Sequence, residues 1–89
     1  MNEINKQATL VDVRTPEEFS ADHVTSAINI PLHQVAQRIK EFREMDKPII
    51  AYCRSGNRSG MAISILKQNG IQDAINGGSI NDLKKAARK

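Results

Sequence analysis

The sequence predicts an α/β domain with a small parallel sheet of four or five strands and helices on both faces. Short apolar segments rich in β-branched residues alternate along the chain with segments whose apolar residues recur every three or four positions. Such an alternation favours parallel strands joined by helical crossovers. We expect residues 1–89 to form a single domain, with its core at about residues 9–87.

A buried strand and a short helix are expected near the start of the chain. Residues 9–13 are largely apolar and β-branched, which predicts the strand. The helix has strong start signals, because Thr15 suits the N-cap, Pro16 suits the first helical position and Glu18 completes a capping box. We expect this helix to end near Ala21.

The middle of the chain predicts a second strand, a longer helix and a third strand. Residues 27–30 predict the second strand, which Pro31 ends. Residues 49–52 form another apolar run and predict the third strand. Between these strands, apolar residues at spacings of three and four predict an amphipathic helix of about three turns. The residues concerned are Leu32, Val35, Ala36, Ile39 and Phe42.

The last third of the chain predicts a third helix, a weak strand, a turn and a final helix. The third helix is expected over residues 60–68, with one apolar face on the core, and Gly70 stops it as a C-cap. Residues 72–75 predict the weak strand and Gly77-Gly78 the turn. Residues 80–87 predict the final short helix.

Cys53 is the only cysteine of the chain, and it follows directly after the third predicted strand. The loop after it, Cys53-Arg54-Ser55-Gly56-Asn57-Arg58-Ser59, leads into a predicted helix, so backbone N–H groups and the helix dipole should face the loop centre. Together with Arg54 and Arg58, these groups are expected to lower the pKa of the thiol. An inert core cysteine would have apolar neighbours on both sides, whereas polar residues follow Cys53. We therefore interpret Cys53 as a nucleophile.

Two further segments also lie where predicted strands end. Ligands of parallel α/β sheets bind beyond the carboxyl ends of the strands, so Asp12, Arg14 and Gly77-Gly78 should meet the Cys53 loop around one site. Asp12 and Arg14 are supporting candidates. Asp12 either orients the loop or satisfies local backbone donors, and the sequence leaves both roles open.

Composition narrows the partners of the protein. The chain carries a net charge of +3, largely from Lys84, Lys85, Arg88 and Lys89, which we interpret as a solvated helix end. No row of aromatic residues accompanies this charge, so nucleic acid is disfavoured, and no apolar stretch approaches the ~20 residues of a membrane span. Two histidines and one cysteine at unrelated spacings make no zinc site, and no cofactor is expected.

The N-terminal residues 1–8 are polar and resemble no signal peptide. As the chain stands it is expected to be cytoplasmic, or periplasmic if a leader has been removed. We expect a monomer.

A series of short motifs occurs in a fixed order over nearly the whole chain from residue 9. The motifs are Asp12-Val13-Arg14, Glu18-Phe19, His23-Val24, Ala27-Ile28-Asn29-Ile30-Pro31-Leu32, Tyr52-Cys53-Arg54-Ser55-Gly56-Asn57-Arg58-Ser59 and Asn76-Gly77-Gly78. In this combination the chain resembles a single-domain rhodanese, most like the small phage shock protein E type. It departs from the family in having Asp22 and Ser26 where Gly is frequent, in lacking a Trp after the Gly-Gly pair, and in lacking the usual N-terminal strand and helix.

The resemblance implies a rhodanese-like fold and a thiosulfate sulfurtransferase. Cys53 would take sulfane sulfur from an anionic donor such as thiosulfate, carry it as a persulfide, and pass it to cyanide, a thiol or an acceptor protein. The substrate-binding residues implied are Arg54, Ser55, Gly56, Asn57 and Arg58, whose N–H groups would stabilise the sulfur. Arg54 would steer the donor, Arg58 would close the loop and pair with a nearby carboxylate, and His23 would be structural.

Two other functions compete with sulfur transfer. Cysteine-dependent phosphatases and arsenate reductases also place a cysteine before an anion-binding loop closed by arginine, but their loop is one residue longer. Only four residues separate Cys53 from Arg58, which suits a single sulfur atom better than a tetrahedral phosphate. The other alternative is a non-catalytic sulfur-carrier or redox-sensing module that docks on a partner protein, and the intact loop does not exclude it.

Overall fold

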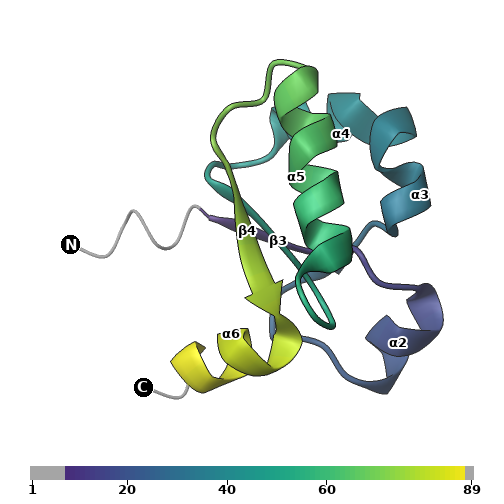
Figure 1. Ribbon diagram of the computed structural model, residues 1–89, viewed down its shortest axis with the longest axis vertical. Coiled ribbons are helices and arrows are strands. Elements are labelled where there is room, and N and C mark those ends of the chain that lie inside the picture. Colours follow the sequence, from purple (N-terminus) through teal and green to yellow (C-terminus); the bar gives the residue numbers. More distant parts are fainter. Residues whose placement is uncertain (1–7, 88–89) are drawn as a thin grey trace.

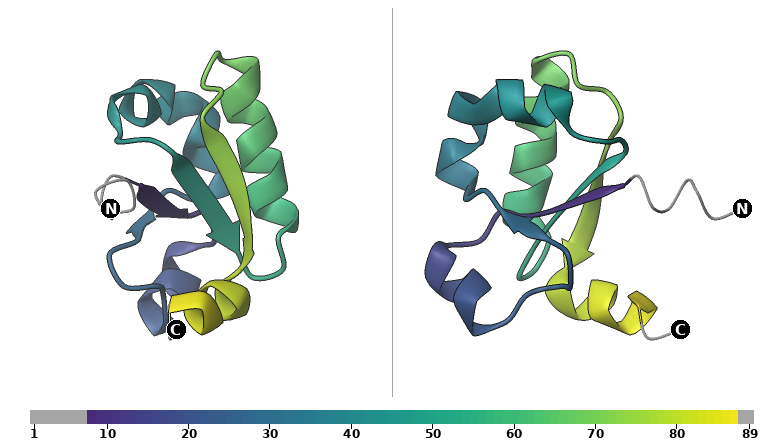
Figure 2. Two further views of the ribbon diagram at one scale, coloured as in Figure 1. Left: turned by 90° about the vertical axis from the view of Figure 1, so that its left-hand side faces the viewer. Right: turned by 180° about the vertical axis from the view of Figure 1, so that it is seen from behind.

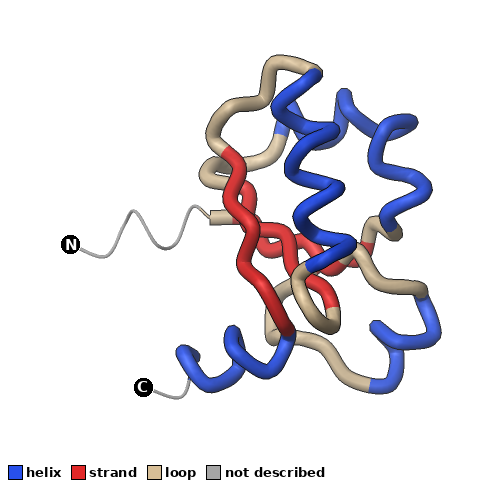
Figure 3. The backbone as a smooth tube through the Cα atoms, viewed as in Figure 1, coloured by secondary structure: helices blue, strands red, loops and turns tan. Residues whose placement is uncertain are grey.

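A computed structural model describes residues 8–87 and contains a four-stranded parallel sheet. The strand order is β2-β1-β3-β4, and Figure 3 shows these strands at the centre of the molecule with helices around them. The predicted α/β class is confirmed, with four strands. The strands are β1 (Thr9–Asp12), β2 (Ile28–Asn29), β3 (Ile49–Cys53) and β4 (Ala74–Ser79).

Five α-helices and one short 3₁₀ segment connect and follow the strands among the described residues (Figure 1). They are α2 (Pro16–Ala21), α3 (Leu32–Val35), η1 (Ala36–Arg38), α4 (Ile39–Glu44), α5 (Asn57–Gln68) and α6 (Ile80–Ala87). None of the helices within residues 8–87 has the length and apolar character needed to cross a bilayer. Of the basic C-terminal residues, Lys84 pairs with Asp22 at 2.6 Å, while Arg88 and Lys89 lie outside the described residues.

The helix predicted from Leu32 to Phe42 is broken in the structure by η1. The bend lies at Arg38, whose φ of −115° and ψ of 28° depart from helical values. The Arg38 side chain spans the bend, because it donates to Gln34 on one side and to Glu41 on the other. Neither glycine nor proline marks this bend, so the apolar spacing alone predicted one continuous helix.

The sheet separates two clusters of apolar side chains, as the alternation of strand side chains requires. Along β3, Ile49, Ala51 and Cys53 join the larger cluster, whereas Tyr52 joins the smaller one. The larger cluster includes side chains of α5 and of the α3–α4 segment, and the smaller includes Ile80 of α6. Figures 1 and 2 show α5 next to α3, with α6 following the end of β4. The predicted helices on both faces are therefore present.

Helix α2 begins as its sequence predicts. The Thr15 hydroxyl accepts from the Glu18 N–H at 3.2 Å, and the Glu18 carboxylate accepts from the Thr15 N–H at 2.9 Å. Pro16 occupies the first turn. This capping box fixes the position of the Glu18 side chain at the start of α2.

Strand β4 corrects the prediction for the C-terminal region. We expected a strand over residues 72–75 and a turn at Gly77-Gly78, but β4 continues through both glycines. A register shift in its pairing with β3 leaves Gly77 as an extra residue, which makes a bulge rather than a turn. A Cβ at Gly77 would lie 2.9 Å from the Ile50 side chain, and Gly78 has a φ of +85°, so both positions need glycine.

The two positions where the family frequently has glycine behave differently. Asp22 is extended, with a φ of −173°, a conformation open to any residue. Ser26 has a φ of +75°, in the left-handed region that favours glycine. The serine is therefore a strained departure, whereas the aspartate is not.

Candidate active site

Cys53 lies at the carboxyl end of β3 and is completely buried. Its Sγ accepts the backbone N–H of Gly56 at 3.0 Å and that of Ser59 at 3.5 Å. The Ser59 hydroxyl oxygen lies 3.6 Å from the sulfur. The loop is the tan segment that joins a strand to the lower end of α5 in Figure 3. It therefore forms the expected cradle, although its donors extend one residue past the predicted range of 54–58.

The shape of this loop depends on Gly56. The residue is the N-cap of α5 and adopts a φ of +99°, which a side chain would disfavour. α5 then begins at Asn57, three residues earlier than the predicted Gly60, because the chain turns within the loop itself. The early start leaves first-turn N–H groups without helical partners, and the Ser59 N–H turns to the sulfur instead.

Two opposing effects act on the pKa of the Cys53 thiol. Burial raises the pKa, while hydrogen bonds from the backbone N–H and the side chain of Ser59, and from the backbone N–H groups of Ser55 and Gly56, lower it. The lowering effects are larger in sum, so the pKa lies below its ordinary value. A thiol with this balance ionises more readily and is a better nucleophile near neutral pH.

Arg58 has a carboxylate partner, as the sequence led us to expect. Its Nη1 donates to Glu18 Oε1 at 2.8 Å, and its Nη2 donates to Oε2 at 3.2 Å. The pair joins the first turn of α5 to the start of α2. Arg54, Ser55 and Asn57 are exposed to solvent, whereas Ser59 is completely buried.

Asp12 and Arg14 form a buried pair with each other. Arg14 Nη2 lies 2.7 Å from Asp12 Oδ2, and Asp12 Oδ1 accepts the Arg14 backbone N–H at 2.9 Å. Arg14 also donates to the Asp22 carbonyl at 2.6 Å. These contacts match the local role considered for Asp12 and tie Arg14 to the segment after α2. The Gly-Gly segment meets the cysteine loop directly, since a Cβ at Gly56 would lie 3.5 Å from Gly78 Cα.

Comparison with known proteins places this cysteine loop in a family. The model of the family described as Rhodanese-like domain matches residues 1–86. The chain belongs to the rhodanese family. Among solved structures, it resembles a rhodanese with anions from E. coli, at 37% identity and a TM-score of 0.77 over 84% of this chain and 89% of that one.

This rhodanese domain matches only part of the length of its curated relatives. The chain is 38% identical over 74 residues to the thiosulfate sulfurtransferase PspE of Escherichia coli, which covers 82% of this chain and 71% of PspE. It is 45% identical over 71 residues to the uncharacterized protein YqhL of Bacillus subtilis, covering 80% of this chain. The match covers 56% of YqhL, so the chain spans little more than half the length of that relative. The predicted likeness to the phage shock protein E type is confirmed.

Two residues beside the rhodanese loop were not predicted as site residues. Ser59 was quoted only as the end of the loop motif, yet it donates its N–H to the sulfur. Asn76 was quoted only with the Gly-Gly pair, yet it bonds to Ser59 and to Gly56. The position of Asn76 next to the two glycines could have pointed to it as a site residue, but we interpreted this segment as a turn. His23 is held locally, by Phe19 ring stacking and a 2.9 Å contact with the Phe19 carbonyl.

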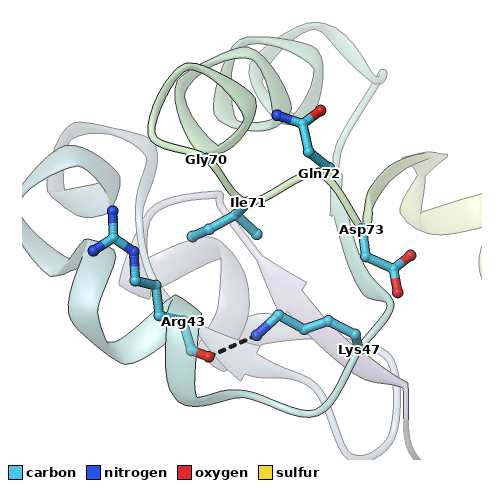
Figure 4. A pocket seen from close by; sticks show the side chains of 6 residues that line it. All are labelled: Arg43, Lys47, Gly70, Ile71, Gln72 and Asp73. Atoms are coloured by element: carbon cyan, nitrogen blue, oxygen red, sulfur yellow. Dashed lines mark hydrogen bonds between the residues drawn. The ribbon is translucent and has the colours of Figure 1, made fainter.

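A surface hollow in this rhodanese is remote from the cysteine. It has a volume of about 350 Å³ and lies at the amino ends of β3 and β4, whereas Cys53 is at the carboxyl end of β3 (Figure 4). Lys47 Nζ donates there to the carbonyls at the end of α4, including Arg43 at 2.7 Å, so it caps that helix. A smaller hollow of about 260 Å³ adjoins the loop through Arg58 and has a mainly apolar lining that includes Val13 and Leu32.

Proposed function

We propose that this rhodanese is a thiosulfate sulfurtransferase that carries sulfane sulfur as a persulfide on Cys53. The observation that carries the proposal is the cradle itself, with the Gly56 N–H at 3.0 Å and the Ser59 N–H at 3.5 Å from the sulfur. Membership of the rhodanese family and likeness to a named thiosulfate sulfurtransferase support it. The lowered pKa of the thiol supplies the nucleophile.

The reaction proceeds in two displacements at divalent sulfur. The Cys53 thiolate attacks the outer sulfur of thiosulfate, and a new S–S bond forms. The S–S bond of thiosulfate breaks, and sulfite leaves with the electron pair of that bond. The acceptor, cyanide or a thiolate, then attacks the outer sulfur of the persulfide. The Cys53 thiolate leaves and is regenerated, which completes covalent catalysis by double displacement.

The loop stabilises negative charge on sulfur at each stage. The backbone N–H groups face the thiolate before reaction and stand ready for the charge of the persulfide after it, in the way that an oxyanion hole receives developing charge. Arg54 is exposed beside the cysteine and attracts the anionic donor by its charge. Ser55, Gly56, Asn57 and Arg58 shape the loop, and Arg58 holds it to α2 through Glu18.

Turnover with three substrates distinguishes this function from its rivals. The protein is incubated with thiosulfate and cyanide, and thiocyanate formation is followed, with an aryl phosphate as the alternative substrate. We expect thiocyanate from the wild type, none from Cys53→Ser, and little phosphate release from either. Phosphate release with no thiocyanate would favour a phosphatase. A persulfide that neither cyanide nor small thiols discharge would favour a sulfur carrier that serves a partner protein.

A further inference from the structure

Asn76 joins strand β4 to the cysteine loop through its side-chain amide. Its Nδ2 donates to the Gly56 carbonyl at 3.2 Å, and its Oδ1 accepts from the Ser59 hydroxyl at 2.6 Å. Oδ1 also accepts the Gly78 N–H at 2.9 Å. The bond to Gly78 lies within β4, and the other two bonds go to the loop. The orientation of the Asn76 amide is therefore fixed by contacts with both segments.

The two loop residues that Asn76 contacts are the same two whose N–H groups donate to the Cys53 sulfur. Gly56 and Ser59 each offer the sulfur an N–H and offer Asn76 a carbonyl or a hydroxyl. A backbone N–H is aimed by the conformation of its residue. A side chain that holds both residues therefore holds the direction of both donors.

The bulge in β4 and a glycine on α5 make this contact possible. Asn76 immediately precedes the extra residue Gly77, and its side chain reaches the face of the sheet that α5 covers. Gly60 leaves room for it, since a Cβ there would lie 3.3 Å from Asn76 Nδ2. Two glycines thus flank the contact, one in each element that takes part in it.

The single proton of the Ser59 hydroxyl points toward Asn76. This hydroxyl has one proton, and its shortest contact, 2.6 Å to Asn76 Oδ1, directs the proton to the amide. The 3.6 Å contact between Ser59 Oγ and Cys53 Sγ then needs the S–H of the neutral thiol as its donor. Among the groups that lower the pKa of the thiol, the Ser59 backbone N–H has the largest effect, so the direction of this N–H matters for the thiolate.

We infer that Asn76 is a positioning residue for the Cys53 sulfur, acting by fixing the N–H donors of Gly56 and Ser59. Its side-chain hydrogen bonds go to Gly56, Ser59 and Gly78, so it acts on the sulfur only through the loop. The inference rests on the proposed function, because that function gives the N–H cradle its catalytic role. The alkylation test of the inference, however, needs no sulfur transfer.

Replacement by leucine removes the polar contacts at nearly constant side-chain size. In Asn76→Leu the Ser59 hydroxyl keeps an acceptor, the Gly56 carbonyl at 3.1 Å, to which it is already within hydrogen-bond distance. No charged group changes, and the Arg58–Glu18 pair stays in place. We expect the N–H donors to lose their aim and the thiolate to lose stabilisation.

The test is the rate of Cys53 alkylation by iodoacetamide as a function of pH. The wild type should show an inflection below that of an ordinary thiol, and Asn76→Leu should move the inflection to higher pH. Persulfide formation from thiosulfate should slow on the order of 100-fold at neutral pH, as for a 1 Å misplacement of reacting groups. Asn76→Ser, too short to reach Gly56, should shift the inflection in the same direction and serves if the leucine variant does not fold.

Asn69→Leu is the matched control. Asn69 is also an exposed asparagine whose Nδ2 donates to a carbonyl, that of Ile65 at 2.8 Å, but it lies at the far end of α5. It should lower the melting temperature without moving the inflection. An unchanged inflection in a folded Asn76 variant, or equal shifts at both positions, would overturn the inference. A shift at Asn76 alone in a protein that never forms a persulfide would support the inference and overturn the proposed function.

Discussion

Arg58 and Glu18 form a two-point ion pair that joins the end of the cysteine loop to the start of α2, with contacts of 2.8 and 3.2 Å. Glu18 belongs at the same time to the capping box of α2, through the Thr15 N–H. The position of the loop arginine is therefore tied to a local signal forty residues earlier in the chain.

Glu18→Gln tests this tie through its pH dependence. The bonds from Arg58, and then from Thr15, lower the pKa of Glu18 from 4.5 to about 2. Because the folded-state pKa is depressed, the carboxylate stabilises the fold fully above about pH 4.5, and this stability is lost as pH falls through about 2. Both side chains are about 30% exposed, so solvent screening limits the loss on mutation to about 1 kcal/mol at pH 7.

Urea unfolding of the wild type and Glu18→Gln at several pH values measures this effect. The glutamine keeps an oxygen for the Thr15 N–H, so the capping box survives, while the charge and the acceptor for Arg58 Nη2 are removed. Glu41→Gln, which breaks the exposed pair with Arg38, is the control and should cost less. A difference between wild type and Glu18→Gln that is as large at pH 2 as at pH 7 would refute the ionic account.

Arg14→Met should destabilise the fold by about 3–5 kcal/mol, because it leaves the Asp12 carboxylate buried without its cation. Asp12 is completely buried and Arg14 is 6% exposed. Methionine keeps the apolar stem, so the loss reports the charge. Denaturant unfolding gives the value. The double variant Asp12→Leu/Arg14→Met should recover much of the stability, and a loss below about 1 kcal/mol in the single variant would show that the pair is not needed.

A glycine inserted beside Gly56 should abolish most sulfur transfer. The N–H groups converge on a volume set by the number of loop residues, and misplacement by about 1 Å costs on the order of 100-fold. Circular dichroism would establish that the variant folds. A glycine inserted beside Gly70, an exposed turn where added atoms meet nothing within 4 Å, should leave thiocyanate formation intact. Full activity in the folded Gly56 insertion would remove loop length as the ground for rejecting a phosphatase.

Ser26→Gly should stabilise the protein slightly, by about 0.5 kcal/mol. Relief of the left-handed backbone at φ +75° gains about 1–2 kcal/mol, and the greater freedom of glycine in the unfolded chain takes back roughly 0.5–1 kcal/mol. Thermal melts measure the net effect. Ser64→Gly, at an exposed position inside α5, should instead lower the melting temperature. A melting temperature lowered by both substitutions would mean that Ser26 has contacts that compensate its strain.

Local signals predicted the site well where one segment contains all its parts. The β3 run, Cys53 and the loop that follows are contiguous, and the Thr15 capping box is complete within four residues. The sequence could not show that Glu18 is the partner of Arg58, nor that Asn76 meets Gly56, because those contacts join distant segments. A Gly-Gly pair suits a turn and a bulge equally, and only its pairing with β3 decides between them.

Intact-mass spectrometry after thiosulfate treatment tests the central claim most directly. Cys53 is the only thiol of the chain, so a persulfide can form only at this residue. We predict that the wild type gains the mass of one sulfur atom, that a reductant or cyanide removes it, and that Cys53→Ser gains nothing. A wild-type protein whose mass is unchanged by thiosulfate, or a Cys53→Ser variant that acquires the same adduct, would contradict the account.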